Sequence, residues 1–313
     1  MRAAYCGGRA LPAAEAAGMP GSADRAGFRE LAVELALEAG RFIRDERPDR
    51  VDVAQTKATD LDVVTEMDTR CEDLLRARLA QHRADDAVLG EEDGWSAGST
   101  GLTWVLDPID GTVNYLYDLP AYSVSVAVVW GDPTAAGGWT PLAGAVFNPG
   151  VDEIFHAHAG GGARLESTGG ANFPTPRELS VPASVPLTKA LVGTGFSYDT
   201  QRRVQQAAVV GELLPRVRDL RRMGSAALDL CSVAAGRLDA YYERGVQAWD
   251  MAAGALVAAE AGAVLSGLDA PASPDMVACA SAGLHTELLA LLREALAAPP
   301  RPGESGGSQN GPA

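Results

Sequence analysis

Three short segments of the chain combine carboxylates with residues that favour turns. Asp107-Pro108-Ile109-Asp110-Gly111-Thr112 follows an apolar run at 104–106, and Gly90-Glu91-Glu92-Asp93-Gly94 follows another at 87–89. Trp249-Asp250-Met251-Ala252-Ala253-Gly254 opens an alanine-rich stretch far downstream. Carboxylates at the ends of separate elements can converge on divalent cations, because Mg²⁺ prefers hard oxygen ligands. The pattern therefore predicts metal-assisted phosphoryl transfer, in which two ions stabilise the entering and the leaving oxygen.

Each segment also has an ordinary structural interpretation. Asp-Pro-x-Asp-Gly suits a β-turn, the acidic run between two glycines suits a solvated turn, and Asp250 suits the N-cap of a helix. Thr65-Glu66-Met67-Asp68 has the form of a capping box. In the functional interpretation, a strand that ends at Asp107 places this carboxylate at the C-terminal edge of a sheet. Gly111 then lets a phosphate approach the backbone N–H groups.

Hydrophobic spacing predicts the elements that must position these residues. An apolar stripe on 28–43 indicates a helix, a second helix is expected to start near Thr65, and a series of strands follows. The order predicts an α/β (α+β layered) fold, with helices on a mostly antiparallel sheet in the first half, and favours a sandwich of two sheets over a barrel. The expected strands are 88–90, 103–106, 123–130, 142–147, 153–157, 163–165, 190–194, 238–242, 263–265 and 276–280, and the expected later helices are 200–214, 225–235, 250–261 and 284–297.

The composition is that of an ordinary globular protein. Of 313 residues, 47% are hydrophobic, and no apolar run approaches the roughly 20 residues that span a bilayer. The start of the chain lacks the apolar segment of a secretory signal, so we expect a cytoplasmic protein. The formal net charge of −15 argues against direct nucleic-acid binding, because phosphate backbones favour clustered Lys and Arg.

The two ends of the chain are poor in large apolar groups. We expect disordered tails at 1–24 and 299–313 around one folded domain at 25–298, with halves at about 25–185 and 186–298. The four cysteines are widely scattered without a CxxC pair, so we expect reduced core residues. His156-Ala157-His158 has no third nitrogen or thiolate nearby in sequence, and we favour surface or packing roles for it over a metal site.

Taken together, the motifs resemble the inositol monophosphatase family of Mg²⁺-dependent, lithium-sensitive phosphatases, over about 27–297. The resemblance rests on Asp62-Val63-Val64-Thr65-x-x-Asp68, Gly90-Glu91-Glu92, Asp107-Pro108-Ile109-Asp110-Gly111-Thr112 and Trp249-Asp250-x-Ala252-Ala253-Gly254. Gly193-Thr194-Gly195-Phe196, and Arg222-Met223-Gly224-Ser225-Ala226-Ala227 leading to Asp239-Ala240-Tyr241-Tyr242-Glu243, resemble the bacterial inositol-1-monophosphatase branch. The resemblance implies an αβαβα sandwich and a homodimer.

A site with two or three Mg²⁺ ions is also implied by the resemblance. Glu91, Asp107 and the backbone carbonyl of Ile109 would hold one ion. Asp107, Asp110 and Asp250 would hold a second, so that Asp107 bridges the two. A third and weaker ion would bind at Glu91.

The resemblance further assigns roles around the attacking water and the substrate. Thr112 and Glu91 would orient and deprotonate the water, and Asp68 would fix the Thr112 hydroxyl. The amides of Gly111 and Thr112 would cradle the phosphate, with Lys57 near it. The polyol would be lined by Asp110, Gly224, Ser225, Ala226, Glu243 and Asp250.

The expected function is hydrolysis of myo-inositol 1-phosphate to myo-inositol and phosphate by direct attack of metal-activated water. No covalent phospho-enzyme is expected, since the motifs contain no candidate nucleophile. Relatives that cleave fructose 1,6-bisphosphate, histidinol phosphate or 3′-phosphoadenosine phosphate share the metal motifs, so these sugar or polyol phosphates and nucleotides stay open as substrates. An accessory partner of the transcription machinery is the non-enzyme alternative, although every expected metal ligand is present.

Overall fold

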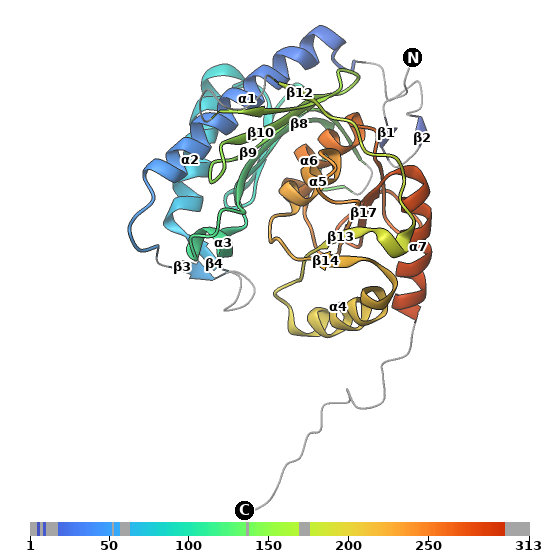
Figure 1. The fold of residues 1–313 in the computed structure, drawn as a ribbon. Coiled ribbons are helices and arrows are strands. Elements are labelled where there is room, and N and C mark those ends of the chain that lie inside the picture. Colours follow the sequence, from blue (N-terminus) through green and yellow to red (C-terminus); the bar gives the residue numbers. More distant parts are fainter. Residues whose placement is uncertain are drawn as a thin grey trace, which may run out of the picture.

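The structure is a computed structural model that describes residues 5–6, 9–10, 18–51, 53–56, 63–135, 138–168 and 176–297. Within them the elements stack in five layers, helix–sheet–helix–sheet–helix (Figure 1). The predicted tails at 1–24 and 299–313 lie largely outside the described residues, and the domain boundaries stay predictions. The predicted tail at 1–24 contains a short strand pair, β1 (Tyr5–Cys6) and β2 (Arg9–Ala10). It also contains the start of the first helix at Ser22.

The first outer layer consists of α1 (Ser22–Asp45) and α2 (Glu66–His82), which follows a strand pair formed by β3 (Val53–Thr56) and β4 (Val63–Thr65). Both helices bury an apolar face against the large sheet. A Cβ on Gly40 would collide with the Phe147 ring, so the glycine lets α1 approach the sheet closely. The capping box predicted at the start of α2 is present, with Thr65 as the N-cap.

The large sheet is mostly antiparallel, as predicted. Its order is β12-β11-β10-β9-β8-β7-β5-β6, and among these strands β5 and β7 form the parallel pair. A turn at 160–162 joins β10 and β11 into a hairpin. The strands are β5 (Ala87–Gly90), β6 (Gly94–Ser96), β7 (Leu102–Asp110), β8 (Ser123–Gly131), β9 (Trp139–Asn148), β10 (Glu153–His158), β11 (Ala163–Ser167) and β12 (Arg177–Glu178).

The second half forms a five-stranded mixed sheet with helices on both faces. The short helix α3 (Thr112–Leu116) lies in the chain between β7 and β8 of the large sheet. The sheet order is β14-β13-β15-β17-β16. Its strands are β13 (Leu191–Thr194), β14 (Asp219–Arg221), β15 (Ala240–Glu243), β16 (Val264–Ser266) and β17 (Val277–Ala280), and the helices are α4 (Thr200–Leu213), α5 (Ala226–Ala234), α6 (Ala248–Glu260) and α7 (Ala282–Ala297), with 3₁₀ turns at Leu187–Lys189 and Leu214–Arg216.

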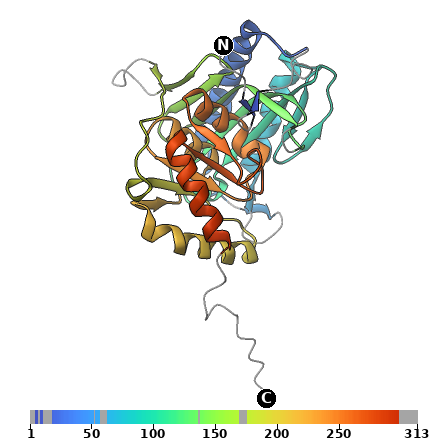
Figure 2. The same cartoon turned by 90° about the vertical axis from the view of Figure 1, so that its right-hand side faces the viewer.

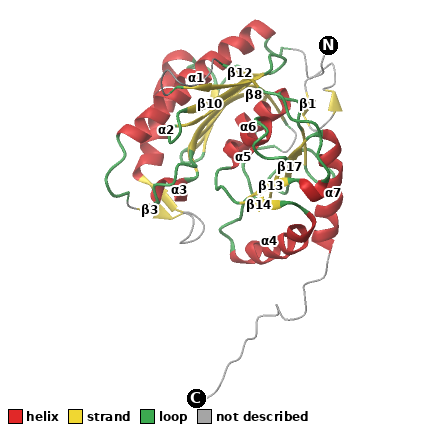
Figure 3. Ribbon diagram, viewed as in Figure 1, coloured by secondary structure: helices red, strands yellow, loops and turns green. Residues whose placement is uncertain are grey.

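Three hydrophobic clusters fill the spaces between the five layers. One lies between α1, α2 and the large sheet, one surrounds α5 and α6 between the sheets, and one lies under α4 and α7. Figure 3 shows α5 and α6 enclosed between strands, and Figure 2 shows α7 along the outer face. Because α6 contacts both sheets, it is apolar almost all around, which explains why no charge occurs between Asp250 and Glu260.

The described thiols agree with the composition of the chain. Cys71, Cys231 and Cys279 are free and buried, as predicted, while the side chain of Cys6 lies outside the described residues. None of the described helices has both the length and the apolar character needed to cross a bilayer.

Candidate metal and catalytic site

A bulge in β7 brings two carboxylates to the same place. Asp107 pairs with Ser125 and Asp110 with Ser123, so β7 uses three steps where β8 uses two. In a regular strand, side chains three residues apart point to opposite faces; the extra residue reverses that alternation. Proline has no N–H to donate to a neighbouring strand, and Pro108 is tolerated because it lies within the bulge, where the pairing of β7 with β8 is interrupted. The prediction that the strand ends at Asp107 is therefore wrong, because the bulge lets β7 continue to Asp110.

A third carboxylate comes from the start of α6. The helix begins at Ala248, with Gln247 as its N-cap, so Asp250 occupies the N3 position and not the N-cap of the ordinary structural interpretation. Its Oδ2 accepts a hydrogen bond from the Gln247 N–H at 2.5 Å, which completes a capping box. Carboxylate oxygens of Asp107, Asp110 and Asp250 all lie within 4.8 Å of one another. Among the described residues, this is the one group of three acidic, histidine or cysteine side chains that could hold a metal.

The surroundings of Asp107 favour a bound cation. Both of its carboxylate oxygens are buried and have no hydrogen-bond partner. Burial raises the pKa of Asp107 well above its usual value, and the charges of Glu91, Asp110 and Asp250 raise it further. A buried carboxylate without a partner is energetically costly, and a divalent cation would relieve both the burial and the repulsion. The oxygen-only donor set fits Mg²⁺.

Asp110, by contrast, is hydrogen-bonded to the start of α5. The Ser225 hydroxyl donates to Oδ2 at 2.5 Å, the Ala227 N–H donates to Oδ2 at 2.8 Å, and the Ala226 N–H donates to Oδ1 at 3.3 Å. Ser225 is also the N-cap of α5 and accepts from the Leu228 N–H. Burial raises the pKa of Asp110 to about 6, although these hydrogen bonds oppose the shift.

Thr112 and Asp68 lie together beside the carboxylates. The Thr112 hydroxyl is 3.2 Å from Asp68 Oδ1 and 3.1 Å from the Ile109 carbonyl oxygen. The other oxygen of Asp68 accepts from the N–H and the hydroxyl of Thr65, at 2.8 Å and 2.5 Å. Burial raises the pKa of Asp68 to about 7. The first turn of α2 thus fixes the position of the Thr112 hydroxyl.

Glu91 reaches this group from the turn that follows β5. Its backbone N–H donates to the Leu106 carbonyl at 3.2 Å, which ties the turn to β7. The charge of Glu91 contributes to the raised pKa values of Asp107 and Asp250, and likewise to those of Asp68 and Asp110. Glu91 therefore belongs electrostatically to the same site.

Gly111 lies at a contact between the two halves. Its φ of 101° is in the left-handed region, and a Cβ there would lie 3.0 Å from the Ala121 oxygen and 3.1 Å from the Gly224 oxygen. Asn114 Nδ2 donates to the Ala121 carbonyl at 2.6 Å and to the Met223 carbonyl at 2.8 Å. Asn114 thereby joins the loop after α3 to the loop before α5. Nothing in the sequence pattern singled out this asparagine.

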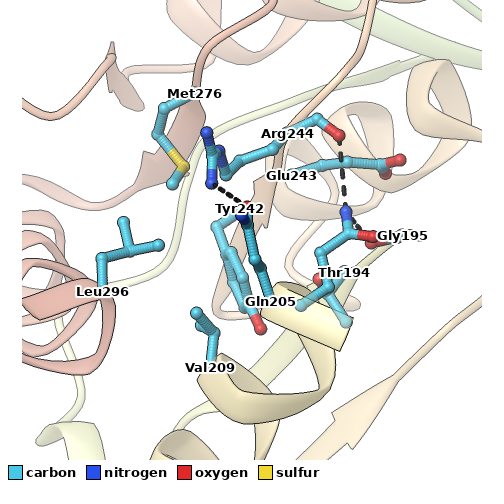
Figure 4. A pocket seen from close by; sticks show the side chains of 10 residues that line it. Thr194, Gly195, Gln205, Val209, Tyr242, Glu243, Arg244, Met276 and Leu296 are labelled. Atoms are coloured by element: carbon cyan, nitrogen blue, oxygen red, sulfur yellow. Dashed lines mark hydrogen bonds between the residues drawn. The ribbon is translucent and has the colours of Figure 1, made fainter. Parts of the chain in front are cut away.

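Glu243 lies at the end of β15, on the side of Asp110. The Tyr241 hydroxyl donates to Glu243 Oε2 at 2.8 Å, and burial raises the pKa of Glu243 to about 7. A Cβ on Gly195 would overlap this carboxylate, so a larger residue at 195 would require the Glu243 side chain to shift. Glu243 also borders a cavity between β13, β15, α4 and α7 (Figure 4), whose other lining residues are Thr194, Gly195, Gln205, Gln206, Val209, Tyr242, Arg244, Met276 and Leu296.

The structure also shows which residues the sequence did and did not identify. Lys57 lies outside the described residues. Asp229 on α5 was overlooked, although it is an acid in an apolar helix; its buried Oδ1 has no hydrogen-bond partner, and burial followed by the charge of Glu243 raises its pKa. His156 and His158 are both buried, and His156 lies 3.1 Å from Glu166, which agrees with packing rather than surface roles, the two alternatives expected for them.

The five layers and the oxygen-only carboxylate cluster define a class: a layered α/β sandwich with a candidate site for divalent cations at the junction of its two halves. A model of the inositol monophosphatase family matches residues 24–297. The chain belongs to this family of metal-dependent phosphoric monoester hydrolases, whose members act on phosphorylated small molecules. The family and the sandwich fold predicted from the motifs are confirmed.

Individual relatives agree with this assignment. Inositol-1-monophosphatase SuhB of Mycobacterium tuberculosis is 45% identical over 282 residues, which cover 85% of this chain and 93% of that protein. A solved structure of Mycobacterium tuberculosis SuhB matches with 44% identity and a TM-score of 0.71, covering 87% of this chain and 97% of that one. The Nus factor SuhB of Pasteurella multocida is 36% identical over 237 residues, which cover 75% of this chain and 83% of that protein.

Proposed function

We propose that this protein is a Mg²⁺-dependent phosphomonoesterase that hydrolyses myo-inositol 1-phosphate to myo-inositol and phosphate by direct attack of an activated water molecule. The observation that carries the proposal is Asp107, whose two buried oxygens have no donor and which lies beside Asp110 and Asp250. The names of the relatives, inositol-1-monophosphatase at 45% identity among them, support the choice of substrate.

The metal ions would be held by oxygen ligands from three segments. Asp107, Asp110 and Asp250 supply the carboxylates that lie together, and Glu91 and the Ile109 carbonyl complete the set. Two or three ions are proposed. When bound, Mg²⁺ supplies Lewis-acid stabilisation of the entering and leaving oxygens.

Thr112 and Glu91 would act on the attacking water. Because the Thr112 hydroxyl proton is directed toward Asp68 or the Ile109 carbonyl, a lone pair of its oxygen is left to accept a hydrogen bond from the water. Glu91 would then accept a proton from the same water. Asp68 acts through Thr112 by holding the hydroxyl in place.

The substrate would lie between α3 and α5. The amides of Gly111 and Thr112 would bind the phosphate, and Lys57 is proposed to lie near it. The polyol hydroxyls would meet Glu243, whose carboxylate can accept two hydrogen bonds, together with Asp110, Gly224, Ser225, Ala226 and Asp250. Because an alkoxide is a poor leaving group, the rate of hydrolysis depends strongly on precise placement of the substrate.

A homodimer is proposed on the family resemblance. Sedimentation velocity tests it: a single species near twice the 32.4 kDa chain mass supports the dimer, whereas a monomer at micromolar concentration contradicts it. Inhibition by Li⁺ is proposed on the same resemblance and is measured in the hydrolysis assay.

A role as a partner of the transcription machinery is the second candidate. It is favoured by one observation, the relative named as a Nus factor at 36% identity. The net charge of −15 disfavours direct RNA contact, so a protein partner is the form of this candidate that the charge allows. The intact carboxylate cluster indicates that such a role would accompany hydrolysis rather than replace it.

Phosphate release from a substrate panel tests the proposal. Inositol 1-phosphate, fructose 1,6-bisphosphate, histidinol phosphate and 3′-phosphoadenosine 5′-phosphate are each assayed with and without Mg²⁺, with Asp107→Asn as the control. Mg²⁺-dependent preference for inositol 1-phosphate is expected. Preference for another ester would overturn the substrate but keep the chemistry, and no release from any of them would leave the partner role as the better account.

A further inference from the structure

Glu72 is a buried carboxylate that touches neither the carboxylate cluster nor the proposed substrate position. It lies on α2, one turn after Asp68, and its side chain is fully buried. Its two oxygens accept the backbone N–H groups of Glu92 at 2.8 Å and Asp93 at 3.0 Å. These residues belong to the three-residue turn between β5 and β6 that also carries Glu91. Glu72 therefore holds the segment from which Glu91 reaches the site.

Arg76, one turn further along α2, binds the same segment, and Glu72 and Arg76 together form a clamp on the turn between β5 and β6. Its Nε donates to Glu72 Oε1 at 2.8 Å, and its Nη2 donates to the Gly94 carbonyl at 2.7 Å. The Glu72 carboxylate thus accepts from the N–H groups of the turn, and the Arg76 guanidinium donates to a carbonyl beside it. The two charged groups also pair with each other. Charge-assisted hydrogen bonds of this kind are stronger than neutral ones.

The fit between the turn and α2 is close. A Cβ on Gly90 would overlap the Glu72 carboxylate, so the strand end is seated directly against the helix. The same helix holds Thr112 through Asp68, at 3.2 Å. Asp68 and Glu72 are four residues apart and share one helix face. One rigid element therefore reaches both groups that the proposed function places on the attacking water.

We propose that Glu72 is a positioning residue for hydrolysis, which sets the place of the Glu91 carboxylate relative to Thr112 and Asp107 by fixing the backbone of the 91–93 turn. This inference rests on the proposed function, because it assumes that Glu91 serves metal and water. It adds a residue that acts through the turn and contacts neither metal nor substrate. Small displacements of a positioned catalytic group reduce rate far more than they reduce substrate binding.

The test substitutes Glu72→Gln, which preserves size but places an amide N–H₂ against backbone donors. We expect kcat to fall by at least about tenfold, the Mg²⁺ concentration for half-maximal activity to rise several-fold, and KM for inositol 1-phosphate to change by less than about twofold. Asp73→Asn, the exposed neighbour on α2, is the matched control and should behave as wild type.

Calorimetric titration of Mg²⁺ into the metal-free protein supplies a readout independent of turnover. Weaker Mg²⁺ binding in Glu72→Gln than in Asp73→Asn, at an equal folded fraction by circular dichroism, supports positioning. Wild-type kcat and Mg²⁺ affinity in Glu72→Gln would overturn it, and so would a loss of activity equal to the unfolded fraction, because the residue would then be only structural.

A second variant keeps the inference testable should Glu72→Gln not fold. Arg76→Gln leaves the carboxylate in place but loosens the clamp, and we expect changes of the same direction and smaller size; wild-type behaviour of a folded Arg76→Gln would overturn the inference. A wild-type protein without Mg²⁺-dependent hydrolysis would refute the proposed function itself. If the wild-type protein shows Mg²⁺-dependent hydrolysis and the folded variants Glu72→Gln and Arg76→Gln match its rate, only the role of Glu72 is refuted.

Discussion

Asp107 and Asp110 lie three residues apart on one strand, yet their surroundings are opposite. Asp107 faces Glu91 and Asp250, and its two oxygens receive no hydrogen bond. Asp110 receives three, from Ser225 and the first amides of α5. The surroundings of Asp107 bring negative charges together without a donor to neutralise them, as a cation site must. Asp110 is already hydrogen-bonded by protein donors, and in the proposed function it would connect the metal ions to the polyol.

The largest expected effect comes from removing charge where no donor compensates it. Asp107→Asn should reduce hydrolysis by at least about 10³-fold, on the scale of the several kcal/mol that a metal ion supplies, while the fold stays intact. Phosphate release and circular dichroism measure the two outcomes. Substantial residual turnover would break the contrast between Asp107 and Asp110 and remove the bridging role of Asp107.

The next effect concerns the hydroxyl between Asp68 and Ile109. Thr112→Ala should lower kcat by about 10²-fold, in the range of a lost proton-transfer or water-orienting group, with little change in KM. Thr112→Ser keeps the hydroxyl and serves as the control, with most of the activity retained. Equal losses in both variants would show that the methyl group, and not the hydroxyl, matters.

The regular elements could be predicted from the sequence because their spacing is local. The stripe on α1, the alternation in β8 and the apolar α6 all reflect which side chains face the core. The bulge in β7 could not be predicted, because it is defined only by pairing with β8. The start of α6 was placed two residues late, since Gln247 is a weak N-cap signal beside Asp250.

The candidate site shows the same division. The acidic motifs and the family resemblance identified the carboxylates that converge, including Asp250 from far downstream. The supporting contacts of Glu72 were missed, because a carboxylate that accepts amides from another segment leaves no local pattern. Asn114 was missed for the same reason: its two acceptors, the Ala121 and Met223 carbonyls, are 102 residues apart in sequence, at 121 and 223.

A smaller effect is expected on the polyol side. Glu243→Gln should raise KM for inositol 1-phosphate by about tenfold, the scale of a hydrogen bond to a charged group, with a lesser effect on kcat. Hydrolysis of p-nitrophenyl phosphate, which has no polyol hydroxyls, should stay near the wild-type level. Equal losses with both substrates would place Glu243 in the chemistry rather than in substrate recognition.

The smallest effect is a dependence of metal-free stability on pH. Burial raises the pKa of Asp68 to about 7 and of Asp110 to about 6, and raises that of Asp107 well above its usual value. The folded state therefore keeps protons that the unfolded chain releases above about pH 4, so stability should fall as pH rises from about 4 to 7.

Thermal unfolding without metal checks this sign: the melting temperature should be lower at pH 8 than at pH 5, and added Mg²⁺ should raise it more at pH 8, where fewer protons compete. Asp107→Asn should flatten the pH dependence and weaken the response to Mg²⁺. A melting temperature that rises with pH in the metal-free protein would contradict the raised pKa values of these buried carboxyl groups.

Anomalous diffraction from crystals soaked in Mn²⁺, a stand-in for Mg²⁺ that scatters anomalously, tests the central claim most directly. We expect anomalous peaks within bonding distance of Asp107, one of them also within bonding distance of Asp110 and Asp250, and loss of these peaks in Asp107→Asn. Fully soaked wild-type crystals without a peak at Asp107 would contradict it.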